Sequence, residues 1–226
     1  MTSKTWAKTL GIGAAALVLG TGISLAHADN GEGEGEGAKV QIGFAIAPVP
    51  LHLEGKDREM VGLGSYLVNA AIECDGCHSA GPATAYAQGG NPYFKGNPPT
   101  IINQATYLGG GRNFGSLIPG TPNIVSRNLT PDRTGHAVGG RTFAEFRQIL
   151  RTGMDLDHLH PNCSATLTSN CFPIVGQPFN GDLLQIMPWP AYQNMTDHDL
   201  RAIYEYLSAV PCIAGPPTGV LHNDCV

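Results

Sequence analysis

The chain has 226 residues and a formal net charge of −5, from 18 acidic residues against 13 Lys and Arg. A mildly acidic chain is a poor partner for nucleic acids or anionic lipids, which attract clustered Lys and Arg, so neither is expected to bind. The 30 Gly and 17 Pro residues predict that turns and loops make up much of the fold. The length suits a single domain.

Residues 1–28 have the three parts of a secretory signal peptide. Lys4 and Lys8 precede an apolar run from about residue 10 to residue 25, and Ala26-His27-Ala28 follows as an A-x-A cleavage signal. An uncleaved membrane anchor is the alternative, but glycines interrupt the run and it is short for a bilayer span. We expect a periplasmic or otherwise exported protein, cleaved after Ala28 and without a membrane span. Its 11 basic and 18 acidic residues would then leave a net charge of −7.

Residues 29–55 are predicted to form a flexible leader. Glycine alternates with glutamate over residues 31–37, and Gly-rich charged stretches of this kind stay solvated. The domain proper is expected to begin at residue 56. From there to residue 72, apolar residues recur at three- and four-residue intervals, which predicts a helix running directly into Cys74. These residues are Met60, Leu63, Leu67 and Ala71.

Cys74-Asp75-Gly76-Cys77-His78 has the C-x-x-C-H pattern to which a c-type haem is attached. Positions i, i+3 and i+4 share one face of a helical turn, so Cys74 and Cys77 can bond the haem vinyl groups while His78 points at the iron. A disulfide, a thiol redox pair or half of a zinc site also uses C-x-x-C, but none requires the trailing histidine. The motif therefore predicts one covalently bound haem c.

Residues 79–141 are rich in Gly, Pro and Asn and contain few alternating apolar runs, so ordered loops wrapped on the haem are predicted there. A haem buries a large apolar area and can hold such loops in place of a conventional core. We therefore expect most of this region to become disordered when haem is not attached.

Two further helices are predicted in the second half of the chain. Thr142-Phe143-Ala144-Glu145 is a capping-box pattern that opens a helix to about Thr152, with Gly153 ending it. Thr196-Asp197-His198-Asp199 opens the other helix, which ends before Pro211. The apolar stripe of the second helix consists of Leu200, Ile203, Tyr204 and Leu207.

Met187-Pro188-Trp189-Pro190 is the best candidate for a second ligand to the haem iron. An electron-transfer haem usually has such a ligand, and a methionine thioether raises the potential. The prolines stiffen the loop and could hold the soft sulfur in place. Core packing is the alternative for Met187, and it is the expected role of Met60, Met154 and Met195. The ring of His78 also needs an acceptor at its other nitrogen, which the sequence does not identify.

A rival pair of iron ligands lies in Asp155-Leu156-Asp157-His158-Leu159-His160. Either His158 or His160 could produce a bis-histidine haem. Together with the two neighbouring acids, the histidines could instead form a surface metal site, or all four side chains could simply be solvated. The sequence leaves these alternatives open.

Four cysteines remain outside the haem motif: Cys163, Cys171, Cys212 and Cys225. Their even number and the oxidising compartment predict disulfides. Four cysteines allow three pairings, of which the local one, Cys163 with Cys171 and Cys212 with Cys225, would close short loops. Free buried thiols are the alternative.

The haem motif, the loop Ile186-Met187-Pro188-Trp189 and the helix over residues 199–207 together resemble the class I cytochrome c family. Asn128-Leu129-Thr130-Pro131-Asp132 resembles the cytochrome c subunits that accompany membrane-bound alcohol and aldehyde dehydrogenases. The same likeness extends to Thr134-Gly135, Phe143, Phe146 and Leu150-Arg151-Thr152-Gly153.

This resemblance implies a mostly α class I cytochrome c fold with extensive loops, in which N- and C-terminal helices pack around a covalent haem. The domain would span residues 56–226, with a long insertion at about 79–185. His78 and Met187 would be the axial ligands of the iron. The chain departs from those subunits in carrying one haem motif where they commonly carry three, and 109 residues separate His78 from Met187.

The implied function is that of a periplasmic single-haem electron carrier, or of an electron-transfer subunit, rather than an enzyme. Its redox partners would be a periplasmic dehydrogenase or other donor and a respiratory acceptor, such as a terminal oxidase or another cytochrome. One alternative is a haem enzyme or gas-binding sensor module with an open distal site, in which His158 or His160 could act as an acid or base. A haem-free thiol oxidoreductase using Cys74 and Cys77 is a further alternative.

Overall fold

The structure is a computed structural model that describes residues 31–80, 84–97, 100–116, 123–157, 180–216, 219 and 221–226. Residues 32–226 form one compact unit, and every interaction below lies within it. Across the described residues the regular elements are helices, and extended segments pair only through isolated bridges. The prediction that the regular secondary structure is mostly α is therefore confirmed for this part of the molecule. The predicted signal peptide lies outside the described residues.

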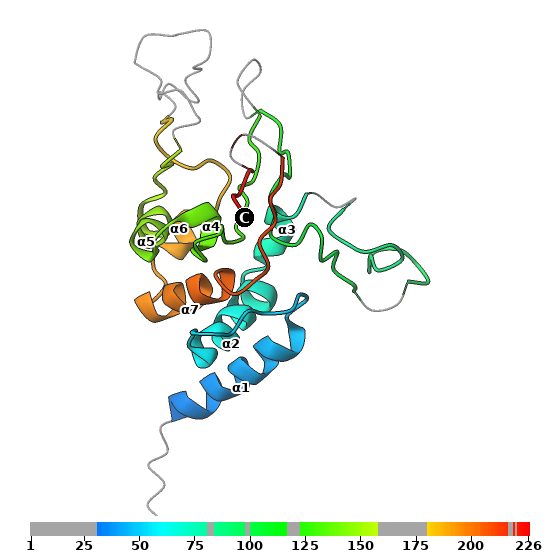
Figure 1. The fold of residues 1–226 in the computed structure, drawn as a ribbon, viewed down its shortest axis with the longest axis vertical. Coiled ribbons are helices and arrows are strands. Elements are labelled where there is room, and N and C mark those ends of the chain that lie inside the picture. Colours follow the sequence, from blue (N-terminus) through cyan, green and yellow to red (C-terminus); the bar gives the residue numbers. More distant parts are fainter. Residues whose placement is uncertain are drawn as a thin grey trace, which may run out of the picture. The chain divides into compact units, whose positions relative to one another are not determined.

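Figure 1 shows the order and arrangement of the helices. They are α1 (Gly31–Ile46), α2 (Arg58–Tyr66), η1 (Leu67–Ala71), α3 (Cys74–His78), α4 (Ala137–Gly140), α5 (Phe143–Thr152), α6 (Trp189–Tyr192) and α7 (Asp197–Leu207). No helix in this described part of the chain combines the length and the apolar character needed to cross a bilayer.

The centre of the helical part is the contact between α2 and α7, which lie side by side in Figure 1. A methyl group at Gly64 of α2 would lie 1.9 Å from the carbonyl oxygen of Ala202 in α7, so only glycine allows this close approach. The predicted apolar stripe of α7 is buried in this core. The helix predicted over residues 56–72 is present as α2 and a following π-helical turn, η1.

Residues 29–55 differ from the flexible leader that their composition predicts. Most of this segment is the helix α1, and Ser65 of α2 donates a hydrogen bond of 2.7 Å to the Gly43 carbonyl oxygen. The ring of Phe44 lies 5.3 Å from the guanidinium of Arg58, and Val49 is buried in the core. The Gly-Glu repeat suggested a solvated chain, but the apolar residues that follow it pack against α2.

The two capped helices form where their local patterns predict them. In α5, Thr142 accepts a hydrogen bond from the Glu145 backbone, Glu145 accepts one from the Thr142 backbone, and Gly153 ends the helix in the left-handed conformation. Thr196 caps α7 in the same way by accepting from the Asp199 backbone at 3.0 Å. Both capping predictions are confirmed.

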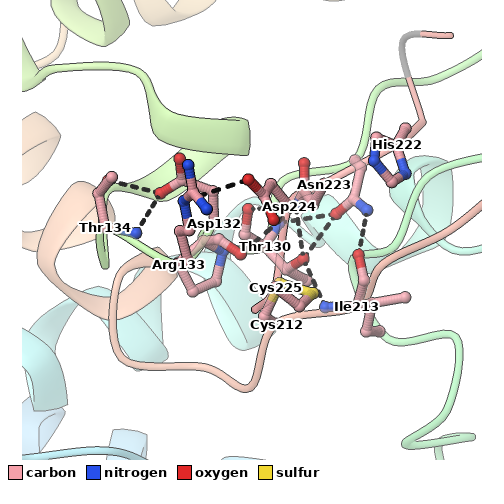
Figure 2. Close-up of a disulfide and its surroundings, with 12 residues drawn as sticks. Thr130, Asp132, Arg133, Thr134, Cys212, Ile213, His222, Asn223, Asp224 and Cys225 are labelled. Carbon is pink, nitrogen blue, oxygen red and sulfur yellow. Dashed lines mark hydrogen bonds and ion pairs between the residues drawn. A yellow bond between two sulfur atoms is a disulfide. The ribbon is translucent and has the colours of Figure 1, made fainter. Parts of the chain in front are cut away.

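The C-terminal segment is bonded to Cys212 by a disulfide and held against residues 128–132 by a cluster of hydrogen bonds, part of which Figure 2 shows. Cys212 and Cys225 are bonded, with their Cα atoms 5.7 Å apart. The buried Asn223 side chain donates to the carbonyl and hydroxyl oxygens of Thr130 at 2.9 and 3.0 Å. The Cys212–Cys225 pair is one of the two local pairs that the sequence offered, whereas Cys163 and Cys171 lie outside the described residues. The Asn128-Asp132 motif therefore anchors the C-terminal segment.

Candidate functional site

The helix α3 presents the C-x-x-C-H motif as one short turn. It begins after Glu73, whose positive φ of 57° places the backbone in the left-handed region, and the thiols of Cys74 and Cys77 are not joined to each other. Burial raises the pKa of the Cys74 thiol to about 12. A thiol that stays protonated near neutral pH is a poor nucleophile, so Cys74 is not suited to be the attacking thiol in the thiol oxidoreductase alternative.

An apolar cavity of about 450 Å³ lies against α3. Its wall includes Cys74, Cys77 and His78 from the motif and Met187 from the loop before α6, so the four predicted cofactor-binding residues line one cavity. The rest of the wall is formed mainly by aliphatic and aromatic side chains, among them Ile72, Ile124, Leu129, Phe146, Leu150, Leu184, Ile203 and Leu207. Two thiols, an imidazole and a thioether on a mainly apolar wall are the groups that a covalent haem needs. The residues present therefore fit this cofactor.

The buried imidazole of His78 is oriented by a backbone carbonyl. Its Nδ1 lies 2.8 Å from the Arg127 carbonyl oxygen, which can only accept, so Nδ1 carries the hydrogen and Nε2 keeps a free lone pair. Burial lowers the pKa of His78, and the Arg127 guanidinium adds to this, although the hydrogen bond opposes it. A neutral imidazole with one nitrogen held by a carbonyl is the form that binds a metal. Arg127 is the acceptor that the sequence did not identify.

Met187 follows a strained residue in a tight turn. Ile186 has a φ of 68°, which is unfavourable for a β-branched side chain, and the Met187 amide donates to the Gln185 carbonyl oxygen at 2.7 Å. The turn continues into α6, so Met187 lies directly before a short helix that Pro188 caps. Gly153 supports it, because a methyl group there would lie 2.2 Å from the indole of Trp189. Strain of this kind is concentrated at functional sites.

Three further residues outside the predicted ligand set, Met195, Arg112 and Tyr192, line the same cavity. Met195, expected to pack at a helix edge, supplies a second thioether. Arg112 donates to the Gly76 carbonyl oxygen and lies 5.1 Å from the ring centre of Phe114. Burial raises the pKa of Tyr192 to about 12, with the nearby cysteines adding to the effect. No local pattern marks these residues, because chain segments distant from α3 bring them to the cavity.

The Asp155-His160 segment is described only in part. His158 and His160 lie outside the described residues, so their predicted roles stay open. Asp155 and Asp157 are not simply solvated, because both form ion pairs with Arg127. Within the described part of the chain, no group of three or more Cys, His, Asp and Glu side chains could hold a metal ion.

Some known proteins are similar to this chain in sequence. No family model and no solved structure matches it. The chain is 26% identical over 150 residues to the cytochrome subunit of fructose dehydrogenase from Gluconobacter japonicus, which covers 66% of this chain. It is 28% identical over 148 residues to the gluconate 2-dehydrogenase cytochrome c subunit of Pantoea cypripedii, covering 65% of this chain. The cytochrome c subunit of the quinone alcohol dehydrogenase of Gluconacetobacter polyoxogenes is 28% identical over 161 residues, or 71% of this chain.

These matches confirm the resemblance to dehydrogenase-associated cytochrome c subunits that the motifs predict. The chain spans only 21%, 22% and 24% of the length of these three relatives. The likeness is therefore to part of each relative.

Proposed function

We propose that this chain is a single-haem c-type cytochrome that carries electrons from a dehydrogenase, or another donor, to a respiratory acceptor. The observation that carries the proposal is the apolar cavity lined at once by Cys74, Cys77, His78 and Met187. The relatives support it, because they are cytochrome subunits of dehydrogenases. A class I cytochrome c fold, with α2 and α7 as its N- and C-terminal helices, belongs to the same proposal.

In this proposal Cys74 and Cys77 would hold the haem through thioether bonds, and His78 and Met187 would bind its iron. A haem bound in this way exchanges one electron at a time between Fe(III) and Fe(II). The chain itself would orient the His78 ring and shield the haem from water. The Arg127 carbonyl keeps the Nδ1 hydrogen of His78 in place, and the apolar wall excludes water and so disfavours additional positive charge at the iron.

The chain is proposed to have no substrate of its own, since two axial ligands leave no open position on the iron. Export across the inner membrane, directed by residues 1–28, would place it in the compartment where c-type haem is attached. A dehydrogenase partner is inferred from the names of the relatives, and the acidic character of the chain would suit a docking surface that carries Lys and Arg.

The first test is the optical spectrum of the exported protein, oxidised and then reduced, together with that of Met187→Ala. We expect a covalently bound low-spin haem with the weak red-end band of a methionine-to-iron bond. Met187→Ala should lose that band, acquire a lower midpoint potential and bind carbon monoxide rapidly when reduced, because the iron loses its distal ligand.

Two other methionine variants make this test specific. Met195→Ala asks whether the second thioether in the cavity is the ligand, and Met60→Ala, on α2 and outside the cavity wall, is the matched control. Loss of the band in Met195→Ala but not in Met187→Ala would show that the ligand assignment is wrong. A wild-type protein without a Soret band would overturn the whole proposal, and a high-spin wild-type haem that binds carbon monoxide would favour an enzyme or gas sensor.

A further inference from the structure

The residue that orients His78 is itself held by two carboxylates. The Arg127 guanidinium donates to Asp155 at 2.8 Å through Nη2 and to Asp157 at 3.0 Å through Nε. The Asp155 side chain is only 1% exposed and that of Arg127 is 15% exposed, whereas that of Asp157 is 36% exposed. Because water screens a buried ion pair little, the Arg127–Asp155 contact is the stronger constraint on Arg127.

Asp155 also belongs to a segment that pairs with the chain leading to Met187. The Asp155 amide donates to the Asp182 carbonyl oxygen at 2.7 Å, and the Leu184 amide donates to the Gly153 carbonyl oxygen at 2.6 Å. Met154 and Leu183 form an isolated antiparallel bridge between these two bonds. Met187 lies three residues after Leu184. The backbone of Asp155 is therefore fixed to the segment that leads to Met187, and its carboxylate to the residue whose carbonyl holds His78.

We infer that Asp155 is a positioning residue that couples the orientation of His78 to the placement of the Met187 loop. The path runs from the His78 ring through the Arg127 carbonyl and guanidinium to the Asp155 carboxylate, and then through the Asp155 backbone to residues 180–184. This inference rests on the proposed function, because it assigns both ends of the path to axial ligands.

The chemistry of the pair suits such a role. Arg127 presents a rigid planar group, so its two carboxylate partners define its orientation as well as its position. Removing Asp155 would leave the Arg127 cation inside the protein with only the more exposed Asp157 to balance it. A buried charge that loses its partner is strongly unfavourable, so the side chain of Arg127 would move toward solvent and displace the carbonyl that holds His78.

The test compares the haem protein with Asp155→Asn and Asp155→Ala. Asp155→Asn preserves the shape and one acceptor oxygen but removes the charge, so it keeps the test usable if Asp155→Ala does not fold. We measure the temperature at which the methionine-to-iron band disappears and, separately, the temperature at which helical circular dichroism is lost. In both variants we expect the band to disappear below the unfolding temperature and by a larger margin than in the wild type.

Hydrogen exchange provides a second measurement that does not depend on the band. Asp155→Asn should speed exchange both in the peptide around residues 124–130 and in the peptide around residues 180–187, while α2 and α7 keep their protection. Asp197→Asn is the matched control, because Asp197 also pairs with two arginines, Arg147 and Arg151, but on the exposed surface and away from the cavity wall. It should change neither peptide.

The outcomes separate the inference from the proposed function. If the band and the helical signal of Asp155→Asn are lost together, or if exchange rises only around residues 153–157, Asp155 is an ordinary buried ion-pair partner and the inference is wrong. If the wild type binds haem but shows no methionine-to-iron band, the ligand assignment fails first and the inference fails with it. Faster exchange in both peptides, with an early loss of the band, supports the coupling.

Discussion

The helical part of the molecule and the part around the cavity are held together in different ways. In the first, α2 and α7 pack directly on each other, with buried residues from both helices and with Gly64 in close contact with Ala202. In the second, loops from residues 79–141 and the turn before α6 contribute apolar side chains to a cavity wall, which α5 and α7 complete from the helical side. The two helices therefore stabilise each other directly, whereas the apolar side chains of the loops face the cavity in which the haem is proposed to bind.

This difference suggests that the two regions respond differently to the same disturbance. A hydrophobic core made of complementary side chains loses stability when its shape changes. Loops that surround a large cofactor lose the apolar surface they pack on when the cofactor is not attached. The predictions below follow from this contrast, in order of decreasing expected effect.

The largest effect is expected when haem attachment is prevented by Cys74→Ala with Cys77→Ala. The described parts of residues 79–141 should lose nearly all slow hydrogen exchange, because the apolar surface against which they pack is missing. Amides of α2 should keep measurable protection, and this helix, none of whose residues lines the cavity, provides the internal control. A single cooperative thermal transition that includes both regions would show that the loops do not depend on the haem.

A substitution at the α2–α7 contact should affect the helical part of the molecule rather than the loops around the cavity. In Gly64→Ala the new methyl group would meet the Ala202 carbonyl, so we expect a loss of about 2–3 kcal/mol in the free energy of unfolding. Denaturant titration measures it. Gly37→Ala on α1 is the matched control, since nothing lies within 4 Å of the added methyl, and it should raise the free energy of unfolding by about 0.5–1 kcal/mol. Equal effects of the two changes would contradict the close packing of α2 on α7.

The smallest effect is expected from opening the Cys212–Cys225 disulfide, which cross-links residues 13 apart. Cys212→Ser with Cys225→Ser should cost about 2 kcal/mol in the free energy of unfolding, at the lower end of the usual range because the closed loop is short. Wild-type protein treated with reductant should show the same shift in denaturant titration. Hydrogen exchange should rise around residues 128–132, which the C-terminal segment contacts, and an unchanged exchange there would argue against the anchoring role of Asn223.

Local patterns in the sequence correctly predicted those parts of the structure that depend on local interactions. Three features depend on residues within four positions of each other, so their spacing is sufficient. They are the capping box that starts α5, the Thr196 N-cap that starts α7, and the short turn that carries Cys74, Cys77 and His78. The predicted resemblance to cytochrome c subunits depends on such short motifs and was confirmed. The prediction of a flexible leader over residues 29–55 was wrong. Composition carries no information about the surface of α2 on which Phe44 and its neighbours pack.

Contacts between distant parts of the chain could not be predicted in this way. The Arg127 carbonyl that holds His78 lies 49 residues away from it, and the sequence contains no pattern that singles out one carbonyl among many. Met187 was predicted as a cavity residue, but only the fold brings Met195 to the same wall. The sequence by itself therefore determined the haem motif and the capped helices, because backbone geometry over one or two turns governs them. Only the tertiary structure decided which acceptor, thioethers and ion pairs surround the cavity, because packing over the whole chain governs these.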